Sequence, residues 1–120
     1  MTIAYWIVAG ILALAFLAAG AQKLLQPESK LRESGVLPER RALGAERGIG
    51  AVEVLGALGL ILPPLTGVAV VLAPIAAVGL AITMLVAVVN HRQHNEPFVP
   101  ALGLGVVAAI VAVLGFLAWV

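Results

Sequence analysis

The residues of this sequence most able to do chemistry are the few ionisable ones inside or beside its apolar stretches. Glu53 is the plainest case, because it lies six residues past Arg47 and a run of apolar residues follows it. On insertion scales, a charge at the centre of a membrane helix costs about 2.5–3.5 kcal/mol. We therefore expect the Glu53 carboxyl to be buried in protein and either paired or neutral.

Lys23 is the expected partner of Glu53. Side chains tilt toward the N-terminus of their own helix, and these two residues lie on successive helices that should be antiparallel. Lys23 and Glu53 should therefore lean toward one another, and His91, at the end of a third helix, should reach the same level. The sequence thus predicts a polar cluster of Lys23, Glu53 and His91, to which Arg47 could add hydrogen bonds.

Each member of this cluster also has a simpler interpretation. Lys23 could extend to the lipid headgroups, and Arg47 could anchor its helix at the membrane surface. His91 could be a solvated residue at a helix end, and Glu53 could serve only as a structural ion-pair partner. No metal site is predicted, because His91 and His94 have no evident third ligand.

Composition indicates that most of this chain is surrounded by a lipid bilayer. Hydrophobic residues make up 62% of its 120 residues and charged residues 11%, against about 45–50% and about 25% in soluble domains. Mean hydropathy is +1.14. The net charge of +1 leaves no basic tail for nucleic acid, and the lack of cysteine excludes disulfides and thiolate ligands from this chain.

The expected fold is all-α, an integral membrane four-helix bundle with antiparallel, up-and-down helices. Four spans of about 20 residues leave no room for a second folded domain, so residues 1–120 form a single domain. The predicted spans cover about residues 3–25, 46–63, 65–90 and 98–119.

Prolines and polar residues set these limits. Pro63 and Pro64 should end the second span, and Pro74 should kink the third. Residues 26–45 are predicted to be a solvated cytoplasmic loop, in which the second helix could begin as early as Pro38.

Orientation follows from the seven basic residues, all of which lie at the first and third connections. The positive-inside rule then places both termini outside and these connections in the cytoplasm. The many Gly and Ala residues suit close helix packing within one bundle, and a homo-oligomer interface is the alternative.

Two motifs resemble the DoxX-like family of small four-helix bacterial membrane proteins. They are Phe16-x-x-x-Gly20-x-x-Lys23 and Arg47-x-Ile49-Gly50-x-x-Glu53, and the pair His91-Arg92 fits as well. The resemblance implies a multi-pass protein of the bacterial plasma membrane, with Lys23, Glu53 and His91 as its polar set and Gly20 and Gly50 as packing positions.

The family takes its name from a subunit associated with a thiosulfate:quinone oxidoreductase. The resemblance therefore implies an accessory subunit of a membrane redox complex, with redox proteins as partners. No cofactor is expected beyond a quinone-like or other lipid at the polar cluster.

Two other functions stay open at this stage. One carboxylate within four short spans would also suit a small proton-coupled exporter. Against this, aromatic residues are only 5% of the chain, and a lysine facing Glu53 would oppose a cationic substrate. A Lys/Glu/His set could equally serve a membrane enzyme of the isomerase type, so the sequence leaves open whether the protein is an enzyme.

Overall fold

Four long helices and one short one make up the protein. The computed structural model describes residues 2–120, which contain no strand. The helices are α1 (Thr2–Leu25), α2 (Glu28–Glu33), α3 (Leu43–Thr66), α4 (Leu72–Gln93) and α5 (Val99–Trp119). All but α2 are long and apolar enough to cross a membrane, which confirms the all-α, four-helix expectation.

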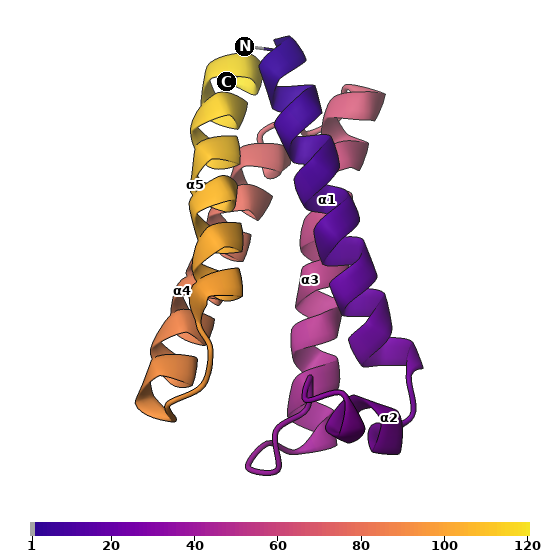
Figure 1. Ribbon diagram of the computed structural model, residues 1–120. Coiled ribbons are helices and arrows are strands. Elements are labelled where there is room, and N and C mark those ends of the chain that lie inside the picture. Colours follow the sequence, from indigo (N-terminus) through magenta and orange to yellow (C-terminus); the bar gives the residue numbers. More distant parts are fainter. Residues whose placement is uncertain (1) are drawn as a thin grey trace.

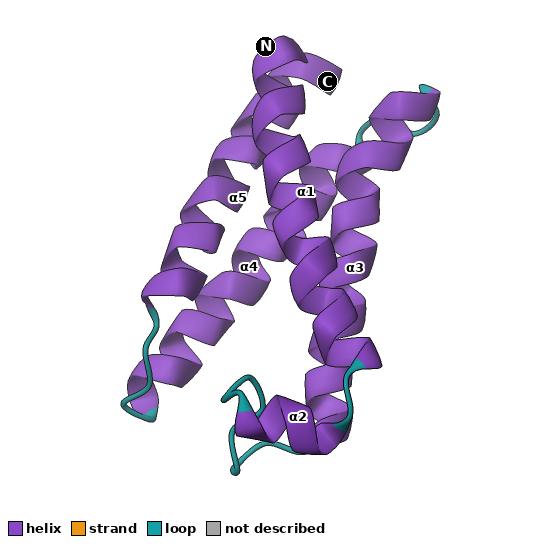
Figure 2. Cartoon of the chain, turned by 45° about the vertical axis from the view of Figure 1, so that its right-hand side comes forward, coloured by secondary structure: helices purple, strands orange, loops and turns teal. Residues whose placement is uncertain are grey.

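The long helices form a ring of neighbours in which α1 packs on α3 and α4 packs on α5 (Figure 1). Further contacts of α3 with α4 and of α1 with α5 close the ring. Both termini lie at one end of the bundle, here called the terminal end, and α2 crosses the opposite end, the α2 end (Figure 2). In both views the α1/α3 and α4/α5 pairs diverge toward the α2 end. That both termini face the outside stays a prediction from the basic residues.

Two glycines bring the backbones of α1 and α3 into contact. A Cβ atom on Gly50 would lie 2.9 Å from the carbonyl oxygen of Gly20 and 2.8 Å from the Cβ of Lys23. A Cβ on Gly20 would in turn lie 2.7 Å from the carbonyl oxygen of Gly50. These separations are shorter than real Cβ contacts, so the approach of the two helices depends on the absence of both side chains.

Helices α3 and α4 approach closely only toward the terminal end. A Cβ on Gly56 would lie 2.6 Å from a methyl carbon of Leu80, and one on Gly59 would lie 2.9 Å from the Cβ of Ala76. The glycines of α3 therefore leave space for side chains of α4 at two successive helical turns.

The expectation that Pro63 and Pro64 end the second span is wrong. Helix α3 continues through both prolines to Thr66, and Gly67, with φ of 75°, ends it. Pro64 has no N–H with which to bond the carbonyl oxygen of Leu60 one turn earlier. The Tyr5 hydroxyl on α1 donates a hydrogen bond of 2.6 Å to that oxygen instead. A neighbouring helix thus replaces the bond that the proline removes.

The third long helix also begins later than expected, at Leu72 rather than near residue 65. Pro74 consequently lies in the first turn of α4, where backbone N–H groups have no partner within the helix. Pro74 therefore does not kink the helix. The pyrrolidine ring of a proline disturbs a helix only where a preceding helical turn is present.

Residues 26–45 are more ordered than the solvated loop expected there. They contain α2, and α3 begins at Leu43, which is before the predicted span limit at residue 46 but after Pro38, the earliest start considered. Leu31 and Leu37 are both fully buried, and the Leu37 N–H bonds the Leu31 carbonyl oxygen at 3.0 Å. Two leucines therefore hold this segment against the α2 end of the bundle.

A substitution of Gly50 by alanine should separate α1 from α3. The added methyl group must displace backbone as well as the Lys23 stem, and overpacking of this kind costs about 1–3 kcal/mol. Gly48→Ala is the matched control, because a Cβ at Gly48 meets nothing within 4 Å. Thermal unfolding in detergent should show a lower Tm for Gly50→Ala and an unchanged or higher Tm for Gly48→Ala. Equal effects of the two substitutions would contradict the close contact.

Candidate functional site

An ion pair joins the last turn of α1 to the middle of α3. Lys23 Nζ lies 2.7 Å from Glu53 Oε1, and the two side chains are 15% and 3% exposed. Both charges thus lie largely away from solvent, between two apolar helices. A buried carboxylate needs a partner of this kind, because desolvation strongly disfavours an isolated charge.

Three residues of α3, each separated by about one turn, contact the end of α1. Glu53 binds Lys23, Gly50 leaves room for the Lys23 stem, and Arg47 binds backbone. The Arg47 guanidinium donates to the carbonyl oxygens of Lys23 (3.2 Å), Leu24 and Gln26 (3.2 Å).

Those carbonyl groups belong to the last turn and the end of α1, where no further helical N–H is available. Arg47 is therefore a cap for α1, and not a member of the side-chain cluster to which the sequence assigned it.

Glu46 is a second buried carboxylate that the sequence reading missed. Its side chain is 1% exposed and forms an ion pair with Arg41. Glu46, Gly50 and Glu53 are spaced so that all three lie on one face of α3, the spacing expected of a buried helix stripe. This spacing was the available signal, but Glu46 lies at the predicted start of the second span, next to the polar loop, where a solvated carboxylate is ordinary.

His91 does not bond Lys23 or Glu53, contrary to the predicted three-residue cluster. Its Nδ1 atom lies 2.8 Å from Glu96 Oε1, in the connection between α4 and α5. Arg40 binds the same carboxylate at 2.7 Å. His91 thus belongs to a separate polar group on the far side of the bundle.

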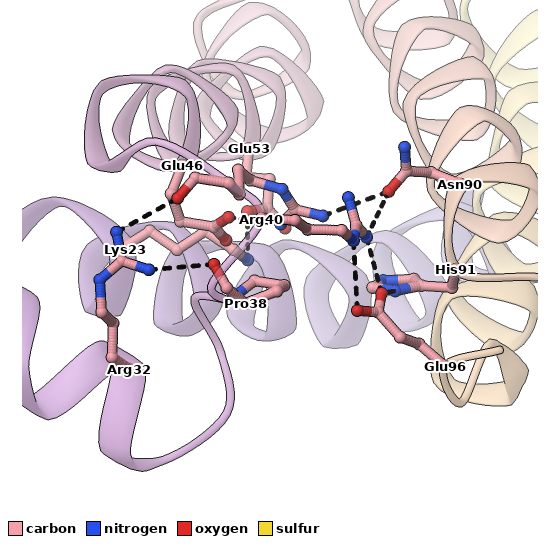
Figure 3. A network of polar contacts seen from close by, with 10 residues as sticks. Lys23, Arg32, Pro38, Arg40, Glu46, Glu53, Asn90, His91 and Glu96 are labelled. Atoms are coloured by element: carbon pink, nitrogen blue, oxygen red, sulfur yellow. Dashed lines mark hydrogen bonds and ion pairs between the residues drawn. The ribbon is translucent and has the colours of Figure 1, made fainter. Parts of the chain in front are cut away.

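Arginine side chains connect that group to the segment that follows α2 (Figure 3). Arg40 donates to Asn90 Oδ1 at 2.6 Å and Arg41 donates to it at 3.4 Å, while Arg41 also pairs with Glu46. We call this set the loop bridge; it comprises Arg40, Arg41, Asn90, His91 and Glu96. It crosses the α2 end between the two helix pairs, where they diverge.

A cavity of about 730 Å³ lies between the helix pairs, next to the loop bridge. Its polar lining includes both buried carboxylates and the groups around them: Lys23, Arg41, Glu46, Glu53, Asn90 and His91. The apolar lining includes Ile49, Ile82, Met84, Val86, Ala87 and Leu104. Three of the four residues predicted to form one cluster thus line this cavity, with the Lys23–Glu53 pair and His91 as separate groups, whereas Arg47 does not line it.

The profile of the DoxX-like family matches residues 7–115, which is nearly the whole chain. This chain belongs to the DoxX-like family. With four helices able to cross a membrane, this DoxX-like chain is a small multi-pass membrane protein. No curated protein and no solved structure matches it.

Removal of the Glu53 carboxylate alone should destabilise this DoxX-like protein. Glu53→Leu leaves Lys23 buried without a partner, and breaking a buried ion pair costs about 3–5 kcal/mol. We expect the lower end of this range, because the Lys23 side chain keeps 15% exposure. The double variant Lys23→Leu/Glu53→Leu should recover most of the loss in thermal unfolding. A double variant as unstable as the sum of the single variants would contradict the pairing.

Acid should weaken the loop bridge through Glu96. Hydrogen bonds from Arg40 and His91 lower the pKa of Glu96 from 4.5 to about 2. Because its pKa is lowered on folding, the ionised Glu96 carboxylate stabilises the fold fully above pH 4.5. This stabilisation is lost as pH falls toward about 2. The difference in Tm between wild type and Glu96→Gln should therefore be largest near neutral pH and shrink across that window. A difference independent of pH would argue against the bridge.

Proposed function

We propose that this DoxX-like protein is an accessory subunit of a membrane redox complex that holds the headgroup of a quinone-like lipid in its cavity. The observation that carries the proposal is the lining of this cavity, in which hydrogen-bonding groups and aliphatic side chains share one space of about 730 Å³. Ligand sites generally combine apolar walls with a few polar groups in this way.

The polar groups suit the carbonyl oxygens of a quinone ring. The Lys23 ammonium has three donor hydrogens, and Glu53 accepts only one of them. Arg41 and Asn90 supply further donors in the same cavity. Glu53 can exchange a proton with a bound ring, because it lies in the cavity lining beside Lys23.

Electrons for such a ring would come from a partner protein, since the chain has no cysteine to ligate an iron–sulfur cluster. The Lys23–Glu53 ion pair weighs against export of cations, because the ammonium neutralises the carboxylate that a cation would need. We place the protein in the bacterial plasma membrane with both termini outside, in line with the basic residues near the α2 end.

Lipid analysis of the purified protein tests this proposal. We expect a quinone in the organic extract, quantified by chromatography and mass spectrometry, in about equimolar amount for wild type. Lys23→Leu/Glu53→Leu should lose it, while Lys30→Leu, which removes an exposed lysine of α2, should retain it. Extracts of wild type without quinone, from membranes that contain quinone, would refute the proposal.

A further inference from the structure

The cavity is polar toward the α2 end and apolar between α3 and α4, and this difference limits how a ligand can reach it. Toward the α2 end, Ser34, Gly35 and Val36 line it beside Arg41. Farther along the same segment, Arg40 and Arg41 of the loop bridge bind α4 and the connection that follows it. Ser34 and Gly35 are exposed, so the cavity meets water here beside charged and polar side chains, a route unsuited to a hydrocarbon tail.

The gap between α3 and α4 is different, because side chains there are apolar and open to the surroundings. The two helices are in contact where Gly59 meets Ala76 and where Gly56 meets Leu80. Continuing the same register by one turn brings Glu53 opposite Thr83, and both of these residues line the cavity. The close contact thus ends at Gly56, and the cavity begins directly beyond it.

Two residues of α4 belong both to the cavity and to the outer surface. Ile82 is 56% exposed and Val86 is 62% exposed, and both line the cavity. They lie within a helix long and apolar enough to cross a membrane, so the medium they meet there is acyl chains. The cavity is therefore continuous with the hydrocarbon of the bilayer along this side.

We propose that the ligand is a lipid with a long hydrocarbon tail, which enters sideways from the bilayer between α3 and α4. Its headgroup lies at Lys23 and Glu53, and its tail leaves past Ile82 and Val86. This inference rests on the proposed function for the headgroup chemistry but adds the route, the orientation and the need for a tail. A quinone or an acyl lipid would satisfy the same geometry.

Photo-crosslinking in vesicles of phosphatidylethanolamine and phosphatidylglycerol tests the route. One probe is a quinone with a diazirine in its isoprenoid tail, and the other is a phosphatidylcholine with a diazirine in one acyl chain. Ile82 and Val86 meet bulk acyl chains in any case, so the diagnostic crosslinks are those that peptide mass spectrometry should map to Ile49 on α3 and Thr83 on α4, within the gap. Crosslinks confined to Ala19 on α1 and to Leu104 on α5 would overturn the route, because these residues line the opposite side.

A matched pair of variants makes the test specific. Val86→Trp fills the gap and should lower crosslinking at Ile49 about tenfold. Leu85→Trp adds the same ring at the preceding residue, which is also 62% exposed but does not line the cavity, and should leave crosslinking unchanged. Equal crosslinking yields in the two variants would overturn the route.

A third variant examines the other end of the cavity. Arg40→Ala removes the contacts of Arg40 with Asn90 and Glu96, and it should leave the crosslinking yield unchanged because access does not run through the loop bridge. A several-fold rise in crosslinking at Ile49 in this variant would contradict sideways access.

The two probes separate this inference from the proposed function. Crosslinks of both probes at the α3–α4 gap support the route and the quinone together. Crosslinks of the phospholipid probe alone support the route and remove the quinone. Crosslinks of neither probe at the gap overturn the route, even where quinone is present in extracts of the purified protein.

Discussion

A lysine and a glutamate that are largely withdrawn from water determine how α1 and α3 must fit together. Their charges can be accommodated only if they touch, and they touch only if the two backbones approach closely at Gly20 and Gly50. Arg47 then satisfies the carbonyl groups at the end of α1 from the same face of α3. One stripe of α3 thus supplies the space, the counter-charge and the cap that the end of α1 requires.

The second helix pair is held in a different manner. Helices α4 and α5 meet the first pair through small residues near the terminal end, whereas near the α2 end charged side chains span the distance. Small residues permit backbone approach, and long arginine side chains permit separation. The cavity is the space left between these two kinds of contact, and part of its aliphatic lining, at Ile82 and Val86, is exposed on the outer surface of the bundle.

Sequence reasoning succeeded where one physical effect dominates. Hydropathy alone determines four long helices, and the N-terminal tilt of side chains on antiparallel neighbours was enough to set Lys23 opposite Glu53. It failed where tertiary contacts replace a local rule. Pro64 does not end α3 because Tyr5 supplies a hydrogen bond from another helix, and no local pattern contains that information.

The polar groups at the α2 end show the same limit. Arg40, Arg41 and Glu96 are ordinary surface residues by sequence, and they gain partners only because the helix pairs diverge and leave a gap to bridge. His91 pairs within its own connection, since Glu96 is only five residues away, and so it did not reach the ion pair. Glu46 could have been found from its spacing to Glu53, whereas Arg47 as a helix cap required the end of α1 to be known.

The Tyr5 hydroxyl bears on how the chain is assembled in the membrane. Until α1 lies alongside, the Leu60 carbonyl oxygen of α3 faces hydrocarbon without its usual donor, which is a costly state in lipid. Tyr5 precedes Pro64 in the sequence, so α1 is synthesised before the proline-containing segment of α3. In that order of synthesis, α1 is available to pack against α3 when α3 is inserted. In a permuted chain that begins with α3, the Leu60 carbonyl oxygen would lack the Tyr5 donor until α1 is synthesised.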